Sequence, residues 1–319
     1  MANASTERDL RPALFEATFE SLQAEPKELP AVWLYDERGS KLYEEITRLP
    51  EYYLPRRERE ILRARAATIA GRTQAQTLVE LGAGAANNIR ILLDAFQSTL
   101  VRFVPVDVSE QALRASAEAV ASAYPQVSVD PVVGDFERDL DPLPGPGRRL
   151  VAILGSTIGN LYPERRERLL PRLVAAPDDA LLLGLDLVKE VSLLEAAYND
   201  RRGVTEAFVR NALTAVNREL DATFDQQRFA YEARWDPKHE WIDIGFRTRR
   251  AHTVSIHGLE TEVEFEEGEP LRIEISSKFR RHGFELEAGR AGLRIESWWT
   301  DGAGEFAVVL LAPEAPSGG

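Results

Sequence analysis

Glycine and acidic residues that follow an apolar run provide the first candidate binding site. The segment TLVELGAGAANN, residues 77–88, is typical of a strand, a Gly82-x-Gly84 loop and the start of a helix. Glycines let a backbone turn tightly and approach a ligand, while a helix start offers free N–H groups. Glu80 precedes the loop, and Asn87 replaces the third glycine of a dinucleotide fingerprint, which favours a cofactor with a cationic amino acid head. The segment alone is equally compatible with a tight turn that holds no ligand.

Two further acidic positions follow apolar runs in the same way. Asp107 ends the second run, where a carboxylate can accept both hydroxyls of a ribose. Asp135 and Phe136 follow the third run, where a carboxylate can accept an adenine amino group and an aromatic ring can pack on the base. Each is also an ordinary residue for a strand end, but three in succession favour an adenosyl site.

Three other segments carry side chains suited to an amphoteric substrate. Asn160, in the polar loop 154–163, offers both a donor and an acceptor to a carboxylate or an amine. Glu274 and Ser276 share one face of a strand by alternation, a pattern that by itself is more typical of a solvent-exposed face. Residues 32–58 are typical of a loop-rich lid whose hydroxyls could bind an amino acid head group, with the aromatic residues Trp33, Tyr35, Tyr43, Tyr52 and Tyr53.

Composition limits the classes of function. The chain has 319 residues, a net charge of −13 and a pI near 5.0, which argues against a general binder of nucleic acid backbones. It has no cysteine, and its four histidines are scattered, so we expect no metal site. The N-terminus is not a signal peptide and no apolar run reaches membrane-spanning length, which predicts a cytoplasmic protein without a membrane partner.

Alternating apolar runs and helical stretches must position these residues. The runs predict an α/β fold, a doubly wound sheet with strands at 77–81, 101–107, 127–133, 149–154 and 180–186. Helical spacing predicts helices at 87–96, at 109–123 with Ser109 as N-cap, and at 163–174. The fold closes with a helix at 284–291 and a hairpin formed by strands at 293–299 and 305–311 around Asp301-Gly302.

A long insertion separates the fifth and sixth strands of this sheet. After residue 186, one long helical stretch reaches Leu220, and strands follow at 229–235, 241–248, 252–257, 261–265 and 271–279. An insertion of about 100 residues greatly exceeds an ordinary crossover connection. We therefore expect a sheet domain of residues 55–190 and 284–319, and a second α+β domain of residues 1–54 and 191–283.

Several of these blocks occur together in one known family. The blocks YDERGSKLYEEITRLPEYYLPRRE, LVELGAGAANN, VDVSEQAL, GDFE, LGSTIGNL, DLVKE and EISSKF stand in order along the chain. In this the sequence resembles the S-adenosylmethionine-dependent histidine Nα-methyltransferases of ergothioneine biosynthesis. The resemblance implies a class I, Rossmann-like methyltransferase sheet and a substrate-binding domain formed by the N-terminal segment and the insertion.

The resemblance also implies roles for individual residues. Cofactor contacts are expected from Gly82, Gly84, Asn88, Asp107, Asp135 and Phe136. Tyr35, Tyr52, Asn160 and Tyr198 would surround the α-amino acid head group, with Tyr35 and Asn160 as the catalytic pair, and Tyr43 would line the pocket. Glu274 and Ser276 would hold the imidazole, which reverses the interpretation that alternation alone favours.

Two positions depart from the family pattern. Asn88 stands where the family often has a lysine, and Ile244 aligns with a methionine of the substrate pocket. A β-branched side chain in place of a pliable thioether alters the shape of that pocket. Glu274 still favours histidine over a larger apolar amino acid, because an apolar side chain would leave the buried carboxylate unpaired.

The expected function is threefold methylation of the α-amino group of L-histidine to hercynine by a monomeric enzyme that uses S-adenosylmethionine. One alternative is a methyltransferase of the same fold that acts on another amino acid or amine. A more distant one is an NAD-dependent oxidoreductase, against which the missing third glycine counts. The last alternative is a module that binds the cofactor but does not catalyse a reaction.

Overall fold

The structure is a computed structural model that describes residues 6–84, 88–137, 147–174 and 176–314. The chain divides into two compact units, each made of segments that are distant in the sequence. The insertion unit comprises residues 1–52 and 191–276, and the sheet unit comprises residues 53–190 and 277–319.

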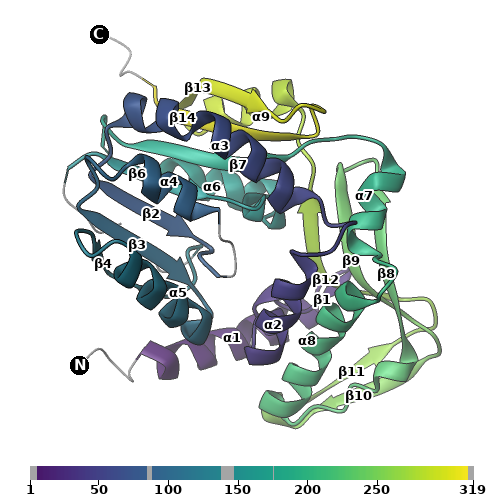
Figure 1. Cartoon of the computed structure of the whole chain (residues 1–319). Coiled ribbons are helices and arrows are strands. Elements are labelled where there is room, and N and C mark those ends of the chain that lie inside the picture. The colour runs from purple at the N-terminus through teal and green to yellow at the C-terminus, as the bar shows by residue number, and fades with distance from the viewer. Residues whose placement is uncertain (1–5, 85–87, 138–146, 175, 315–319) are drawn as a thin grey trace. The chain divides into compact units, whose positions relative to one another are not determined.

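The sheet unit is built on one mixed sheet (Figure 1). Its central strands are β2 (Thr77–Leu81), β3 (Arg102–Asp107), β6 (Arg149–Ile153) and β7 (Ala180–Asp186), all parallel to their neighbours in this group. The strand order is β13-β14-β7-β6-β2-β3-β4, and the short β5 (Val132–Val133) pairs with β3. The antiparallel hairpin of β13 (Leu293–Thr300) and β14 (Phe306–Pro313) joins the edge of β7, as the sequence predicts.

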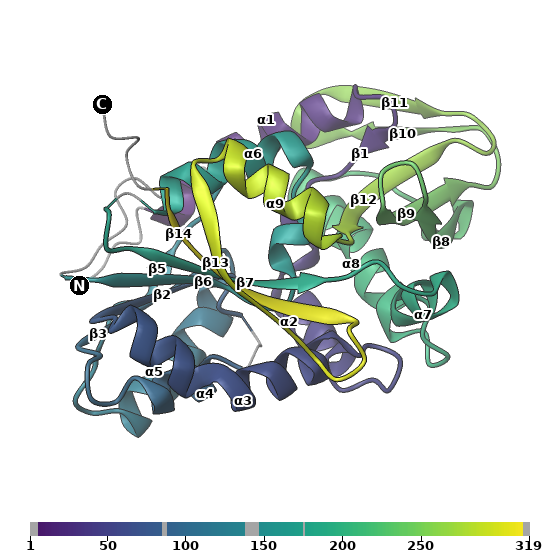
Figure 2. The same cartoon turned by 90° about the horizontal axis from the view of Figure 1, so that it is seen from above.

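Helices cover both faces of this sheet (Figure 2). One face carries α3 (Leu54–Thr73), α4 (Ile89–Ala95) and α5 (Glu110–Ala123), and the other carries α6 (Pro163–Leu173) and α9 (Arg281–Arg290). All seven residues of β7 are buried, which explains its unbroken apolar run. Side chains of α6 and α9 such as Leu170 and Phe284 complete the core on their face.

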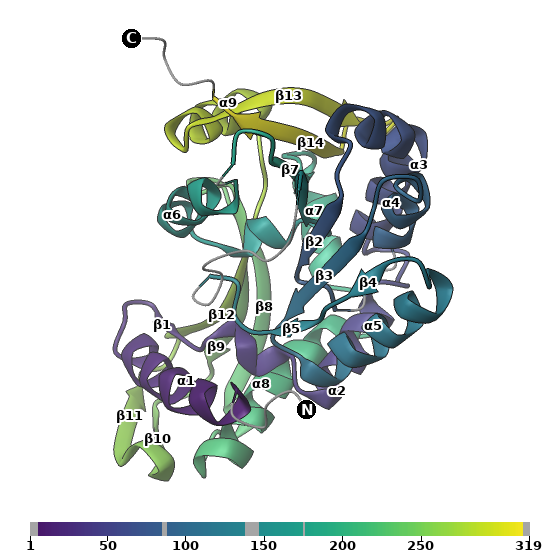
Figure 3. The same cartoon turned by 90° about the vertical axis from the view of Figure 1, so that its left-hand side faces the viewer.

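The insertion unit contains a four-stranded sheet in the order β1-β12-β9-β8 and a separate hairpin. The sheet strands are β1 (Lys27–Glu28), β8 (Phe229–Asp236), β9 (Trp241–Thr248) and β12 (Pro270–Ser277). β10 (His252–Ile256) pairs with β11 (Thr261–Phe265), and β1 adds to β12 in parallel (Figure 3). The helices are α1 (Thr6–Leu22), α2 (Glu37–Ile46), α7 (Val191–Tyr198) and α8 (Val204–Leu220), with a 3-10 turn, η1, at Ala31–Leu34.

Three sequence predictions are wrong in detail. The expected loop-rich lid contains η1 and α2, whose first turn is capped by the carboxylate of Asp36. The single helical stretch after residue 186 is two helices, because Asp200 accepts the N–H groups of Val204 and Thr205 and so starts α8 anew. The third strand is split into β4 (Ser128–Val129) and β5.

The division between the units also differs from the expected boundaries at residues 54 and 283. Residues 277–283 belong with the sheet unit, because Phe279 N–H donates to the carbonyl of Asp186 at 2.8 Å and Val188 N–H donates to the carbonyl of Phe279 at 3.1 Å. These bonds tie the segment to the end of β7. In the described part of the chain, no helix is both long and apolar enough to cross a membrane.

Candidate active site

The loop after β2 and the end of β3 are joined by one carboxylate. Gly82 has a φ of 76°, a conformation that favours glycine. Gly84 N–H donates to Asp107 Oδ2 at 2.9 Å, and Ser109 N–H donates to Asp107 Oδ1 at 2.8 Å. The expectation that the side chain of Ser109 caps α5 is wrong, because that side chain makes no cap bond. The backbone N–H of Ser109 is bound by Asp107. Burial raises the pKa of Asp107, and these backbone bonds oppose that rise.

Two more buried carboxylates lie next to this loop. Glu80, on β2, is 1% exposed, and neither of its carboxylate oxygens has a hydrogen-bond partner among the residues that the structure describes. Glu58, on α3, is fully buried and accepts Gly155 N–H at 2.7 Å and Asn88 Nδ2 at 2.8 Å. Sequence reasoning missed Glu58. The available signal was an acidic residue on the apolar face of a helix, between Leu54 and Leu62.

The side chain of Asn88 is committed to protein partners. It donates to Glu58 and to the carbonyl of Pro55, accepts from Arg59 Nε at 3.1 Å, and is 2% exposed. Both of its amide hydrogens are therefore used. In place of the direct cofactor contact expected from the sequence, we propose that Asn88 orients Glu58. Asn87 lies outside the described residues.

Asp135 and Phe136 follow β5, as expected from the sequence. Asp135 Oδ1 accepts Glu137 N–H at 2.9 Å, and Phe136 packs partly buried against the core of the sheet unit. Gly134 N–H donates to the carbonyl of Asp107 at 3.1 Å, which holds this turn beside the end of β3. The ends of β2, β3 and β5 are thus neighbours, since parallel strands of one sheet end at the same edge.

In the insertion unit, aromatic residues from distant segments form a cluster. The ring of Tyr35 lies 6.0 Å from that of Tyr43 and 5.5 Å from that of Phe208 on α8. Tyr52 hydrogen-bonds with Tyr43 and meets the ring of Tyr198 edge-on at 6.0 Å. Burial raises the pKa of Tyr52 well above its usual value, and the neighbouring tyrosines add to the rise. Tyr52 is therefore a neutral phenol.

The cluster continues onto β12 through α7. The hydroxyls of Tyr198 and Ser276 lie 2.7 Å apart and are buried, and Tyr231 donates its hydroxyl to the carbonyl of Tyr198 at 2.6 Å. Burial raises the pKa of Tyr231, and the charges around it, including that of Glu274, raise it further. Glu274, two residues before Ser276, is partly exposed. Hydroxyls and a carboxylate therefore occur together on this side of the sheet.

The other two expected substrate residues lie on separate elements. Ile244 is 2% exposed on β9, the neighbour of β12, and pairs with Ala233 across to β8. Asn160 ends the 3-10 turn η2 (Thr157–Asn160) in the sheet unit, directly after β6. The loop that carries Asn160 contains two left-handed residues, Gly155 with φ of 67° and Ser156 with φ of 61°.

Replacing Gly39 by alanine is expected to destabilise the Tyr35–Tyr43 region. A Cβ at Gly39 would lie 1.6 Å from the carbonyl oxygen of Leu34, so the turn between η1 and α2 would have to shift. We expect a loss of about 1–3 kcal/mol in the free energy of unfolding, measured by urea denaturation. Gly71→Ala is the matched control: nothing lies within 4 Å of its Cβ on α3, so it should stabilise the protein. Equal stability of Gly39→Ala and the wild type would contradict this account.

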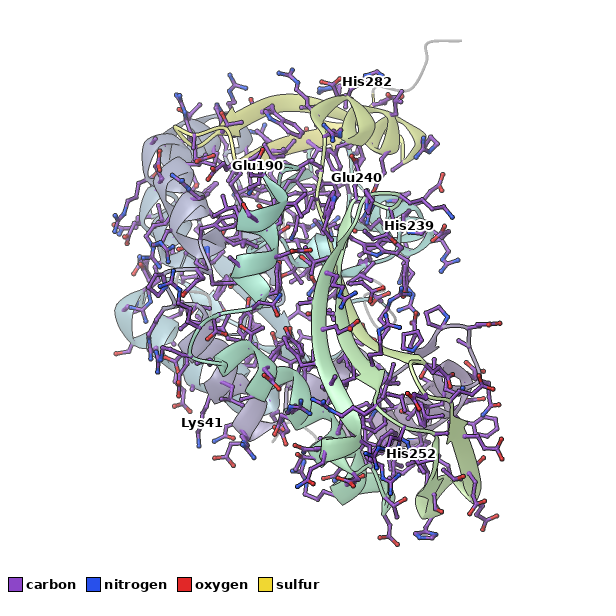
Figure 4. The ribbon with its side chains drawn as sticks, turned by 90° about the vertical axis from the view of Figure 1, so that its right-hand side faces the viewer. Lys41, Glu190, His239, Glu240, His252 and His282 are labelled. Atoms are coloured by element: carbon purple, nitrogen blue, oxygen red, sulfur yellow. The ribbon has the colours of Figure 1, made fainter. Side chains whose placement is uncertain are left out.

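The histidines do not gather into a metal site. His239 stacks on Trp241 at 4.4 Å beside the β8–β9 turn, and His252 stacks on Phe265 in the β10–β11 hairpin (Figure 4). Among the described residues, no three His, Cys, Asp or Glu side chains are arranged to hold a metal ion.

The model of one protein family matches residues 14–313, and its description is histidine-specific methyltransferase, SAM-dependent. The chain belongs to this family. It is 48% identical to the histidine N-alpha-methyltransferase of Mycolicibacterium smegmatis over 91% of both chains. It is 46% identical to the histidine N-alpha-methyltransferase of Mycobacterium tuberculosis over 94% of this chain and 95% of that protein. Ergothioneine biosynthesis protein 1 of Neurospora crassa is 28% identical over 90% of this chain and 33% of its own length.

The edge of the sheet fits the cofactor of this methyltransferase family, S-adenosylmethionine. Among the described residues, the carboxylate oxygens of Glu80 have no hydrogen-bond donor. The ammonium group at the amino acid end of the cofactor is such a donor. The absence of a side chain at Gly84 leaves room beside Asp107, whose Oδ2 would lie 3.3 Å from a Cβ there. The sheet is the class I, Rossmann-like methyltransferase fold that the sequence predicts.

Proposed function

We propose that this protein methylates the α-amino group of L-histidine with S-adenosylmethionine, three times in succession, to give hercynine. The observation that carries the proposal is the family match over residues 14–313 together with the 48% identity to a histidine N-alpha-methyltransferase. The fungal relative named for ergothioneine biosynthesis supports a place in that pathway. We further propose that the sheet unit binds the cofactor and that the insertion unit binds histidine.

The chemistry asks the protein mainly to hold a neutral amine in line with an activated methyl group. S-adenosylmethionine supplies that methyl group as a sulfonium. A free α-amine titrates at about pH 7.7–8.0, so part of it is already neutral near pH 7. Positioning, rather than strong base catalysis, is the main contribution of the protein.

We assign the positioning of the head group to the tyrosine cluster, Tyr35, Tyr43, Tyr52 and Tyr198, with Asn160 as a further contact. Tyr35 and Asn160 are proposed as the catalytic pair, because each offers a polar group to the reacting amine or its carboxylate. The phenol of Tyr52 is neutral and can donate a hydrogen bond to a carboxylate. Tyr198 fixes the hydroxyl of Ser276 at 2.7 Å, so the cluster is rigid where it meets β12.

Glu274 and Ser276 are proposed to recognise the imidazole, and Ile244 to shape the pocket beside it. A carboxylate accepts the imidazole N–H, and a hydroxyl can donate to or accept from the other nitrogen. A substrate without such groups cannot form these hydrogen bonds with Glu274 and Ser276, which disfavours it strongly.

Incubation of the purified protein with S-adenosylmethionine and an equimolar mixture of the common amino acids tests the proposal. Mass spectrometry of the products should show histidine carrying one, two and finally three methyl groups, because the same amine is the acceptor in each round. Methylation of a different amino acid would keep the fold and the cofactor but refute the substrate. A parallel incubation with added NAD tests for hydride transfer by absorbance. Formation of NADH there would favour an oxidoreductase.

A further inference from the structure

Three carboxylates in the sheet unit lie close together, the buried Glu58 and Glu80 and the half-buried Asp107, but they differ sharply in their hydrogen bonds. Asp107 accepts backbone N–H groups from Gly84, Val108 and Ser109. Glu58 accepts one bond from Gly155 N–H and one from Asn88. Glu80 accepts none from any described residue. A buried ionised carboxylate without donors is far less stable than one with two or three.

The difference decides which group carries a proton. Glu58 and Asp107 repel a negative charge on Glu80, and burial adds to their effect, so the pKa of Glu80 lies well above its usual value. Burial raises the pKa of Glu58 to about 7, although its bonds to Asn88 and Gly155 and the charge of Arg59 oppose the rise. Near neutral pH, Glu80 is therefore a neutral carboxylic acid, and Glu58, with a pKa of about 7, is only partly ionised.

The groups that face Glu80 come from each neighbouring element. Helix α3 contributes Glu58, and β3 contributes Asp107. Arg59 donates to the amide oxygen of Asn88, and its charge acts on Glu58. On β6 the register partner is the uncharged Ala152. The described residues thus place two acids and no direct cation against Glu80.

We propose that Glu58 and Glu80 form a proton-linked site for the ammonium group of S-adenosylmethionine. In the absence of cofactor the pair holds a proton on Glu80. When the ammonium binds, the O–H bond of Glu80 breaks, the proton leaves to solvent, and the carboxylate left behind pairs with the cation. The reaction is a simple exchange of one positive charge for another in a buried site, so the net charge of the site is unchanged.

The sign of the pH dependence follows from linkage. A bound cation lowers the pKa of Glu80, so binding releases a proton at any pH between the bound and free pKa values. Affinity for the cofactor therefore increases as pH rises through that window. Because Glu80 exchanges at most one proton, its linkage lowers the dissociation constant by at most about tenfold per pH unit. Protons that Glu58 exchanges in both proteins cancel when the wild type is compared with a Glu80 variant.

S-adenosylhomocysteine is the probe for this proposal, because it keeps the ammonium group and has no methyl to transfer. Its binding is measured by calorimetry from pH 6.0 to 7.5 in buffers that differ in ionisation enthalpy, which counts the protons released. Glu80→Gln retains the shape of the neutral acid but has no proton to lose. We expect the wild type to release about half to one proton more than this variant. Glu80→Gln should bind about 10- to 100-fold more weakly at pH 7.5.

The same substitution at an exposed position, Glu118→Gln on α5, is the matched control and should release as many protons as the wild type. Equal proton release by the wild type and Glu80→Gln would overturn the proposal, as would a wild-type affinity that does not change with pH. Should Glu80→Gln bind too weakly to titrate, the wild-type proton count decides, and a count of zero refutes the linkage. The probe binds without an amino acid acceptor, so an error in the proposed substrate leaves this test unaffected.

Discussion

Replacing Asp186 by alanine is expected to lower the free energy of unfolding by about 3–5 kcal/mol. Asp186 ends β7 and is fully buried in the sheet unit. Its carboxylate lies 2.5 Å from Lys189 Nζ and 3.0 Å from Lys278 Nζ, and it accepts the hydroxyl of Tyr53 at 2.9 Å. Removing this acid leaves the buried ammonium groups of the two lysines without the carboxylate that they share.

The pKa of Lys189 depends on opposing effects of burial and of the neighbouring charges. Burial lowers its pKa, and the attraction of Asp186 opposes that effect, while Lys278 adds repulsion. Without Asp186, we expect the lysines to lose their protons or draw in water, and either change weakens the end of β7. Urea denaturation followed by circular dichroism measures the loss.

Asp130→Asn is the matched control for this substitution. Asp130 lies 2.8 Å from Arg102 Nε, but its side chain is 40% exposed, so the change should cost about 1 kcal/mol or less. A similar loss in both variants would show that the buried position of Asp186 is irrelevant.

Asp186 also connects three segments that the sequence keeps far apart. The chain passes between the compact units after residues 52, 190 and 276, and Tyr53, Lys189 and Lys278 lie within two residues of these points. Each of them bonds to Asp186 within the sheet unit. Tyr53 and Lys278 are each more than 80 positions from Asp186 along the chain, so nothing in the local sequence around DLVKE or SSKF predicts that they meet it.

The sheet was predictable for a physical reason. Strands buried on both faces must be apolar throughout, so β2, β3, β6 and β7 are visible as apolar runs. The edge proposed to bind the cofactor followed, because parallel strands end together. Gly82 comes directly after β2, Asp107 is the last residue of β3, and Asp135 lies two residues after β5. The hairpin β13–β14 was visible from its Asp-Gly turn.

What escaped prediction depends on contacts between distant residues. Glu58 and Glu80 are ordinary glutamates in the sequence, and only folding places both beside Asp107. The burial of Asn88 against Glu58 and the pairing of Tyr198 with Ser276, 78 positions away, are equally invisible to local patterns. For β12, alternation alone favoured a solvent face, and only the family resemblance pointed to a substrate role for Glu274.

That role gives the second large prediction, which concerns Glu274→Ala. If Glu274 accepts the imidazole N–H of histidine, its loss removes a hydrogen bond to a charged group, which contributes about 1.5–3 kcal/mol. The specificity constant kcat/KM for histidine should then fall by about 10- to 150-fold. Melting temperature should change little, because Glu274 is partly exposed.

Selectivity separates this role from a general loss of activity. Without the carboxylate, a larger apolar amino acid no longer has to cover an acid to which it offers no hydrogen bond, so its rate relative to histidine should rise. Glu274→Gln keeps an oxygen acceptor and should fall between the wild type and the alanine variant. Glu264→Ala, an exposed change on β11, should leave kcat/KM within about twofold, as surface substitutions do. A Glu274→Ala enzyme as active on histidine as the wild type would show that the imidazole is recognised elsewhere, and the pocket around Ile244 would be the next place to look.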